Sequence, residues 1–300
     1  MVLLMVDVTL LTDARYVNPV NPDWYKQNIL EDDRLVREAL ERKGLTVART
    51  HWDNPDYDWT KTKLAVFRTT WDYFDRYAEF SKWLDQVNTQ TKLVNPLSLI
   101  RWNIDKHYLH DLEQQGIRIP PTVFIEPGDQ RTLAEIIAPT GWTDCILKPA
   151  ISGAARHTYR LNQKNISEHE EIFRQLIAHE SMLLQEFQKP VLEKGEVAYM
   201  LFGGKFSHAV LKKAKPGDFR VQDDFGGTVH DYKPTNQEIE FAERVVAHCK
   251  PLPVYARVDV IWNNQHQLCV SELELIEPEL WFRKHHAAAE LFAEALCKIV

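Results

Sequence analysis

The 300-residue sequence predicts a mixed α/β (α+β) protein with an open α/β unit followed by two further units. Near the N-terminus, apolar β-rich segments alternate with an amphipathic segment, which is typical of a parallel sheet. A strand–helix–strand order follows, and two hairpins with clear turn residues then dominate the C-terminal part. We expect units at 1–97, 98–186 and 187–300.

Composition narrows the classes of function. A hydrophobic content of 44% provides for a large core, and a formal charge of −7 gives no basic excess that would indicate nucleic acid as the main partner. No apolar run is long enough to span a bilayer, so we expect no membrane partner. The opening MVLLMVDVTLL lacks a positive leader, and the cysteines are scattered, so we expect a cytoplasmic protein with reduced thiols.

The first unit begins with a predicted strand at 2–9. An amphipathic helix is predicted from Glu31 to Arg42, with acids in its first turn, bases in its last turn and Gly44 at its end. Strands at 45–50 and Leu64–Phe67 follow. Strands separated by a helix form a parallel sheet, whose ligands lie at the carboxyl ends of the strands.

The segment RTTWDY falls at such a strand end. We expect it to contact substrate through Arg68, Thr69, Trp71, Asp72 and Tyr73. An arginine here suits a substrate carboxylate, and the aromatic residues suit the wall of a pocket. The alternative is a loop in which Arg68 simply pairs with Asp72.

The central unit contains a possible phosphate-binding loop. After a predicted helix at about Ile104–Gln115, the strand DCILKPAI carries Lys148 and leads into the small residues Ser152–Ala155. A predicted strand at His157–Leu161 follows. Small residues let backbone N–H groups approach phosphate oxygens, and Lys148 can add an ammonium. A hairpin turn with one glycine is also common, and no P-loop motif is present.

The C-terminal part begins with the predicted buried strand Leu183–Phe187, whose exposed edge we expect to pair with an adenine ring. A hairpin is predicted over Gly195–Ala214, with Gly203-Gly204 at its turn. We expect a mobile loop at Gly217–Gly227, and helices at Asn236–Cys249 and about His286–Ile299.

The hairpin Val254–Glu279 brings carboxylates together. Glu272 and Glu274 are two residues apart and share one face of their strand, and the hairpin places Asp259 opposite them. Three convergent carboxylates repel one another unless a cation lies among them, and oxygen ligands suit Mg²⁺ or Mn²⁺. The alternative is that one or two of these acids point to solvent from an edge strand.

With these elements in order, the sequence resembles the ATP-grasp superfamily of carboxylate–amine ligases. Arg257-Val258-Asp259, followed thirteen residues after the aspartate by Glu272-Leu273-Glu274, is similar to the Arg-x-Asp and Glu-x-Asn of D-alanine–D-alanine ligases. The phrases RTTWDY, NPLSLIRWNIDKHYL, GDFRVQDDFGG and ELELIEP resemble the glutathione-synthetase-like branch that contains D-cycloserine ligase. The resemblance therefore covers nearly the whole chain.

The resemblance implies an N-terminal substrate domain and two subdomains that clasp ATP between them. It implies that a first group of residues contacts ATP: Lys106, Lys148, Ser152, Gly153, Ala154, Ala155, Gln185, Glu186, Phe187, Glu196 and, as a competitor of Glu196 for the ribose, Glu193. It implies metal binding by Asp259, Glu272 and Glu274, and catalytic roles for Arg257, Arg220 and Lys212. Two positions depart from the pattern, because Glu274 replaces the usual Asn and the lid loop has a single glycine.

The function implied is ATP-dependent activation of a small carboxylate as an acyl phosphate, followed by attack of an amine and release of ADP and phosphate. Relatives of this type are often dimers, so a homodimer is possible. Two alternatives stay open at this point. One is a phosphotransferase on the same fold, and the other is a nucleotide-binding protein without turnover. The retained acids and Lys148 argue against the second.

Overall fold

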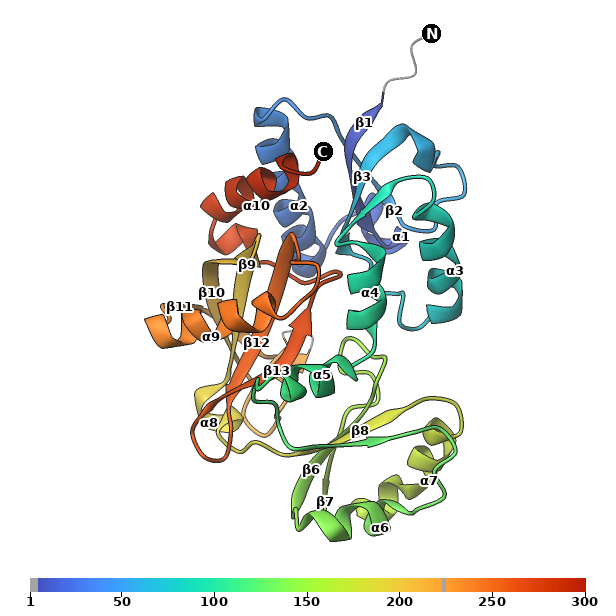
Figure 1. Cartoon of the computed structure of the whole chain (residues 1–300), viewed down its shortest axis with the longest axis vertical. Coiled ribbons are helices and arrows are strands. Elements are labelled where there is room, and N and C mark those ends of the chain that lie inside the picture. The colour runs from blue at the N-terminus through green and yellow to red at the C-terminus, as the bar shows by residue number, and fades with distance from the viewer. Residues whose placement is uncertain (1–4, 223–224) are drawn as a thin grey trace.

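The structure is a computed structural model that describes residues 5–222 and 225–300. Three sheets are stacked along the long axis of the molecule (Figure 1), with the first sheet near one end, the sheet of β5–β8 at the other and the third between and beside them. Both hairpins expected from the sequence are present. The predicted unit boundaries stay predictions.

The first sheet is parallel throughout. Its strands, in spatial order, are β2 (Val47–His51), β1 (Val6–Thr12), β3 (Thr62–Thr69) and β4 (Lys92–Val94). Its helical elements are α1 (Ala14–Val17), α2 (Trp24–Arg42), η1 (Trp59–Lys61) and α3 (Tyr77–Val87). Residues 2–4 of the predicted first strand lie outside the described residues, and β1 continues to Thr12.

Helix α2 begins seven residues before the predicted start at Glu31. Asp23 caps it, since its side chain accepts a hydrogen bond from the Lys26 N–H at 2.9 Å. This start was missed, although Asp23 is a typical N-cap residue and Ile29 already belongs to the buried face of the helix. Helix α3 was not expected, although its buried residues Phe80, Leu84 and Val87 follow helical spacing.

The second sheet is antiparallel. Its strands, in spatial order, are β5 (Thr122–Ile125), β8 (Met182–Glu186), β6 (Asp144–Pro149) and β7 (Tyr159–Asn162). Helices α6 (Leu133–Ile137) and α7 (Ile166–Ile177), with η2 (Ala138–Thr140), cover one face. The expectation that β8 exposes an edge is wrong, because β5 and β6 pair with it on both sides.

The third sheet is also antiparallel. Its strands, in spatial order, are β11 (Thr228–Tyr232), β10 (Lys205–Lys213), β9 (Glu196–Phe202), β12 (Tyr255–Trp262) and β13 (Leu268–Glu274). Its helical elements are α8 (Val191–Lys194), α9 (Asn236–Ala247), η4 (Phe282–Lys284) and α10 (Ala287–Cys297). Residues 223 and 224 of the predicted mobile loop lie outside the described residues.

A break in the connecting helices positions one lysine. The helix predicted at about 104–115 is present as α5 (Tyr108–Gln114), and a second helix that was not predicted, α4 (Leu97–Ile104), precedes it. Between them, the Asp105 side chain accepts from the His107 N–H at 3.0 Å, and the Lys106 N–H donates to the Ala150 carbonyl at 3.0 Å. The break therefore ties Lys106 to the strand that carries Lys148.

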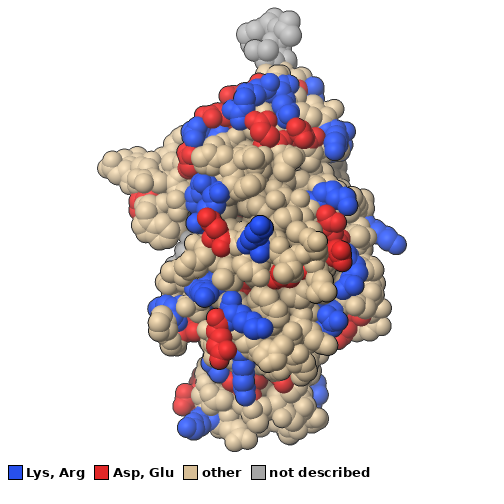
Figure 2. Space-filling model, turned by 90° about the vertical axis from the view of Figure 1, so that its left-hand side faces the viewer, with Lys and Arg blue, Asp and Glu red and all other residues tan. Residues whose placement is uncertain are grey.

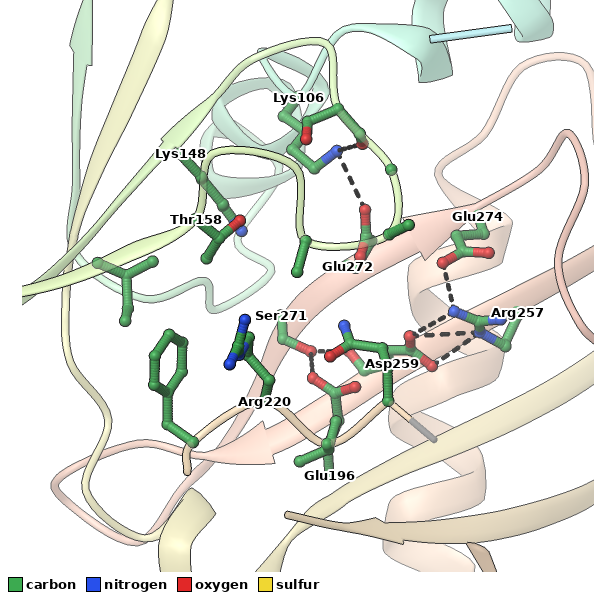
Figure 3. Close-up of a pocket in the computed structure, with 18 of the residues that line it drawn as sticks. Lys106, Lys148, Thr158, Glu196, Arg220, Arg257, Asp259, Ser271, Glu272 and Glu274 are labelled. Carbon is green, nitrogen blue, oxygen red and sulfur yellow. Dashed lines mark hydrogen bonds and ion pairs between the residues drawn. The ribbon is translucent and has the colours of Figure 1, made fainter. Parts of the chain in front are cut away.

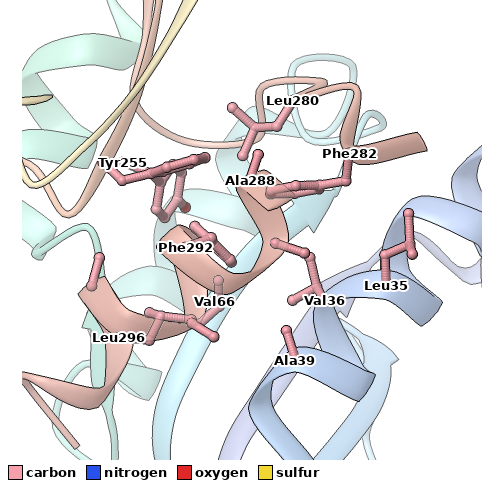
Figure 4. Close-up of a cluster of buried hydrophobic side chains, with 14 of the residues drawn as sticks. Leu35, Val36, Ala39, Val66, Tyr255, Leu280, Phe282, Ala288, Phe292 and Leu296 are labelled. Atoms are coloured by element: carbon pink, nitrogen blue, oxygen red, sulfur yellow. The ribbon is translucent and has the colours of Figure 1, made fainter. Parts of the chain in front are cut away.

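A shared apolar core joins the first and third sheets. Helix α10 lies beside α2, and Phe292 packs with Val36 of α2 and Val66 of β3 (Figure 4). The second sheet has its own core, which includes Leu147, Phe173 and Leu184. The first and third sheets thus form one packed body, and the second sheet has its own core on one face while Leu183, on the other face, joins the core of the third sheet.

Basic and acidic side chains are interspersed over the face that Figure 2 displays. No helix in the described ranges is long and apolar enough to cross a membrane. The expectation that nucleic acid is not the main partner stays a prediction.

Candidate active site

A cavity of about 590 Å³ lies where the three sheets meet. Its walls come from β6 and β8 of the second sheet, from β12 and β13 of the third, and from the loop Ser152–Ala155. The first unit contributes residues from α1, α2 and the segment after β3. A cavity of this kind lets a ligand enter and then encloses most of the ligand's surface with protein.

The acidic cluster predicted for the C-terminal hairpin is present at this cavity. In the β12–β13 pairing, Asp259 faces Glu272 and Arg257 faces Glu274. One carboxylate oxygen from each of Asp259, Glu272 and Glu274 lies within 4.8 Å of the other two. Figure 3 shows the three carboxylates with Arg257 beside them. These acids offer only oxygen ligands, which Mg²⁺ and Mn²⁺ prefer.

Basic side chains compensate this negative charge. The Lys106 ammonium lies 3.2 Å from Glu272 and donates to the Ser152 carbonyl at 2.6 Å. Lys212 bridges Glu196 at 2.6 Å and Asp259 at 2.9 Å.

Arg257 also belongs to this network. It donates to both Asp259 and Glu274. These pairs make the acid cluster compatible with burial.

The electrostatic environment differs among the three acids. Burial opposes ionisation of Asp259, but Arg257 and Lys212 hold its pKa below the usual range. Burial acts on Glu272 in the same way, and Lys106 and Lys148 hold its pKa low. Burial and the neighbouring carboxylates raise the pKa of Glu274 to about 8, although Arg257 opposes this rise. Among the three acids, Glu274 is thus the one whose negative charge the neighbouring cations compensate least.

Lys148 lies on the second-sheet side of the cavity, opposite the acids (Figure 3). Burial lowers its pKa to about 8, and Lys106 adds to the effect while Glu272 opposes it. Lys148 and the three acids thus face each other across the cavity, while Lys106 pairs directly with Glu272. Such a pair of walls suits a ligand with several negative charges that also carries a divalent cation.

The small-residue loop has an unusual backbone. Ala154 and Ala155 have φ values of 47° and 54°, and His157 has 48°, all in the left-handed region. L-residues with a side chain pay roughly 1–2 kcal/mol each to adopt this conformation. The single glycine has a different role, since a Cβ at Gly153 would lie 2.5 Å from the Phe74 ring. The loop therefore contacts the first unit closely.

Comparison with known proteins identifies the family. A family model described as "D-cycloserine synthetase DcsG, N-terminal domain" matches residues 8–95. The cycloserine biosynthesis protein DcsG of Streptomyces lavendulae is 30% identical over 280 residues, which cover 87% of this chain and 91% of the relative. The chain belongs to the DcsG family of ATP-grasp ligases.

Solved structures agree with this assignment. The crystal structure of D-cycloserine synthetase DcsG matches with a TM-score of 0.83 at 29% identity, covering 97% of this chain and 98% of that chain. A D-alanine–D-alanine ligase from Bacillus anthracis complexed with ATP has a TM-score of 0.61 at 13% identity, covering 98% and 97%. This DcsG-family chain is therefore a carboxylate–amine ligase with the ATP-grasp fold, as the sequence indicated.

Most of the predicted site residues of this DcsG-family chain meet at the cavity. Those that line it are Trp71, Lys106, Lys148, Ser152, Gly153, Ala154, Ala155, Gln185, Glu186, Phe187, Glu196, Arg220, Arg257, Asp259, Glu272 and Glu274. Arg220 pairs with Asp218 at 2.8 Å there. Lys212 lies behind the cavity wall and reaches it through its two acidic partners.

The two glutamates proposed for a ribose lie in different cavities. Glu196 is in the large cavity, where its carboxylate accepts from Lys212 and from the Ser271 hydroxyl at 2.7 Å. Glu193 lines an adjoining cavity of about 430 Å³, which shares Glu186 and Phe187 with the first. Glu196 is thus committed to its neighbours, whereas Glu193 is exposed on α8.

The predicted substrate contact of Arg68 is wrong, and so is the alternative pairing with Asp72. Arg68 shares a face of β3 with Leu64 and Val66, because side chains alternate along a strand. Its guanidinium is 2% exposed, pairs with Asp33 of α2 at 3.2 Å and lies 5.1 Å from the Phe282 ring centroid. It therefore serves the core between the first and third sheets.

The other residues of RTTWDY divide between core and cavity. Thr69 is buried and its hydroxyl contacts that of Thr12 at 2.6 Å, and Asp72 pairs with Arg76 at 2.9 Å. Neither is among the residues that line the cavity, so the structure does not bring them together with the other predicted site residues. Tyr73 is buried behind the wall and hydrogen-bonds Glu277. Trp71 does line the cavity, as predicted.

Several cavity residues were not predicted: Arg15, Tyr16, Tyr25, Phe74, Asp75, Glu277 and Glu279. The signal for Glu277 and Glu279 was present in ELELIEPE, where this pair repeats the two-residue spacing of Glu272 and Glu274. Tyr16 and Tyr25 carry no comparable local pattern. Only the tertiary fold brings them to Trp71.

Proposed function

We propose that this ligase binds ATP with its phosphates between Lys106, Lys148 and the acid cluster. The observation that supports this proposal is the convergence of these two lysines with Asp259, Glu272 and Glu274 in one cavity. Phosphoryl transfer depends mainly on positioning and on neutralisation of charge, and both are available here.

The donor set fits a divalent cation. Asp259, Glu272 and Glu274 would hold Mg²⁺, with Mn²⁺ as a substitute, and Glu274 supplies a carboxylate where an Asn is usual in relatives. Such an ion neutralises phosphate charge when it is bound.

The chain's own residues perform the remaining work. Lys148 and Lys106 neutralise phosphate oxygens, and Lys106 couples the lid to Glu272 through its bond to the Ser152 carbonyl. Arg257 and Arg220 stabilise the anionic intermediate that forms when the amine attacks the acyl phosphate. Closure of the lid loop Ser152–Ala155 over the site excludes water, which would otherwise hydrolyse the acyl phosphate.

We propose that Glu193, and not Glu196, holds the ribose hydroxyls. Glu196 is occupied by Lys212 and Ser271 at the acidic end of the cavity, so it positions Lys212. Adenine would lie between the two cavities near Gln185, Glu186 and Phe187. The N–H groups of Glu186 and Phe187 already donate to the Pro121 and Asp144 carbonyls. Other groups of this segment must therefore form the hydrogen bonds to adenine.

The relationship to a D-cycloserine synthetase directs the choice of substrate. D-Cycloserine is a ring closed between a carboxyl carbon and an aminooxy nitrogen, so opening that bond gives β-aminooxy-D-alanine. We propose an amino acid of this kind as the carboxylate substrate. Its carboxylate would take the γ-phosphoryl group of ATP, and a nitrogen nucleophile would then displace phosphate and lose a proton.

A hydroxylamine trap tests the proposal. Purified protein is incubated with ATP, Mg²⁺, hydroxylamine and, in turn, β-aminooxy-D-alanine, D-serine, D-alanine and their L forms. We expect a hydroxamate, with one ADP and one phosphate released per product, for at least one of these acids. Lys148→Met should abolish hydroxamate formation. A panel without any hydroxamate would refute the proposed substrate class.

Phosphate left on the acid in place of a hydroxamate would show transfer without amide formation and would equally contradict the proposal. Binding has a separate readout. ATP with Mg²⁺ at about 100 times its Kd should stabilise the fold by about 2.7 kcal/mol, measured as a rise in melting temperature.

A further inference from the structure

Two glutamates that line the cavity, Glu186 and Glu277, form no ion pair with a lysine, arginine or histidine of the described residues, but Glu186 lies on β8 and accepts a hydrogen bond from the Gln188 amide at 3.3 Å. Asp259, Glu272, Glu274 and Glu196 each pair with a lysine or arginine, and Glu279 pairs with Arg283. Glu277 also lines the cavity, but no Lys, Arg or His nitrogen of the described chain forms an ion pair with it. Its recorded side-chain partner is the Tyr73 hydroxyl.

The surroundings of Glu277 favour a cation. Burial raises its pKa to about 7, and the nearby carboxylate of Glu272 adds to this, although the Tyr73 hydroxyl and Lys106 oppose it. Lys106 acts on it from a distance but is already committed to Glu272 and the Ser152 carbonyl. A ligand ammonium at this position would supply the missing partner.

Aromatic rings form the part of the cavity wall that contacts the backbone of Glu277. The Trp71 indole N–H donates to the Glu277 carbonyl at 2.9 Å, which fixes the ring beside it. Tyr16 and Tyr25 pack against Trp71 with ring centroids at 6.0 and 6.1 Å. Aromatic faces attract ammonium groups, and tryptophan does so most strongly.

The position also suits the chemistry of the site. Glu277 follows Glu274 by three residues, and the two carboxylates act on each other electrostatically. In an α-amino acid, the ammonium and the carboxylate are attached to one carbon. An ammonium at Glu277 therefore leaves the neighbouring carboxylate on the side of Glu274 and Arg257, where acyl phosphate formation is proposed.

We propose that Glu277, with the aromatic wall of Tyr16, Tyr25 and Trp71, binds the α-ammonium group of the carboxylate substrate and selects amino acids over other carboxylic acids. This inference rests on the proposed function, because it assigns a part of the same site. The residue that we propose for substrate selection is therefore not Arg68, which lies in the core. It is the acidic Glu277, which would recognise the positive ammonium group of the substrate.

The test uses the hydroxylamine trap with paired acids. D-Alanine, D-serine and β-aminooxy-D-alanine are each compared with their α-N-acetyl derivative, which lacks the ammonium. Wild-type protein should favour the free amino acids. Glu277→Gln should raise their KM about 10- to 100-fold, as expected for a lost charged hydrogen bond, while the KM for ATP stays near wild type. The Glu277→Gln protein should also favour the free amino acids over their acetylated derivatives less strongly than the wild-type protein does.

Controls separate recognition from folding. Asp231→Asn removes a carboxylate that is 90% exposed and should change nothing. Glu277→Asp keeps the charge and should recover part of the lost affinity. A Glu277→Gln protein that retains the wild-type preference for free amino acids overturns the inference, as does an equal rise of the KM for ATP. Absence of hydroxamate from every acid with wild-type protein overturns the proposed function and the inference with it.

Discussion

Lys212 holds its ammonium between the carboxylates of Glu196 and Asp259 and is itself buried. These acids raise the pKa of Lys212, although burial opposes them, so the side chain stays charged. Removal of one partner from a buried ion pair leaves a carboxylate uncompensated, which is more costly than removal of the whole pair.

We therefore expect Lys212→Met to lower the free energy of unfolding by about 3 kcal/mol and to reduce turnover strongly. Urea denaturation and phosphate release measure the two effects. Lys213→Met is the matched control, because Lys213 is exposed on the other face of β10. Equal losses in both variants would contradict the role assigned to Lys212.

His208 gives the fold a dependence on pH outside the active site. Burial lowers its pKa to about 4, the neighbouring His285 adds to this, and the bond to the Leu280 carbonyl at 2.8 Å opposes it. The unfolded chain binds a proton near pH 6.5, and the folded chain binds it only near pH 4. The unfolded state thus takes up more protons between these values.

The contribution of His208 is complete above pH 6.5 and is lost as the pH falls towards 4. The loss amounts to roughly 3 kcal/mol. His208→Gln keeps a donor for Leu280 and removes the titration, so its unfolding free energy should fall less over this range than that of wild type. Urea melts at pH 7 and pH 4.5 measure this difference, and parallel pH profiles would contradict the assignment.

At the scale of single residues, the sequence was most informative where contacts are local. Asp259, Glu272 and Glu274 were predicted to converge because one hairpin fixes their register. Arg68 was misplaced, although its alternation with Leu64 and Val66 indicated the core face. Tyr16 and Tyr25 carried no local signal, because their site depends on α1 and α2 packing towards Trp71.

At the scale of elements, the lid loop is held against the first unit. Gly153 leaves no room for a Cβ beside the Phe74 ring, and Arg156 of the same segment lies 4.0 Å from Asp75. The loop is thus fixed at a glycine that cannot be replaced without movement of an aromatic side chain.

Gly153→Ala should lower the free energy of unfolding by about 1–3 kcal/mol, because it overpacks this contact. Phe74→Leu removes the obstructing ring edge, so the double variant should lose less than the sum of the two single changes. Urea melts of the four proteins in this cycle give the interaction energy. Strict additivity would show that the ring and the loop do not meet.

The order of strands and helices could largely be predicted, but one interruption could not. The turns at Gly203-Gly204 and after Trp262 gave both hairpins from local chemistry. The break between α4 and α5 depends on a bond from the Lys106 N–H to the distant Ala150 carbonyl, which no local pattern shows. Helix α3 was missed although its apolar spacing was readable.

At the scale of the whole molecule, two packed bodies differ in how they are stabilised. Residues of the first and third sheets share one core, which extends from Val8 to Phe292. The second sheet relies on a smaller core between Ile125 and Leu184. Units with separate cores open separately, at their own free energies.

We expect amide hydrogens of β6 and β8 to exchange through a smaller opening free energy than those of β3 and β12. A difference of about 1.4 kcal/mol would appear as tenfold faster exchange in mass spectrometry. Saturation with ATP and Mg²⁺ should reduce the difference, since the ligand contacts both bodies. Equal protection of these four strands without ligand would mean that the second sheet unfolds only together with the first and third sheets.

The packing of α10 on α2 has a consequence for how such enzymes diversify. The last helix of the chain supplies Phe292 and Leu296 to the core over the first sheet. A recombination event that transplanted the N-terminal part alone would leave behind the helix that seals it. Exchange of the N-terminal part between family members therefore requires both ends of the gene to be exchanged together, or a compensating change in that helix.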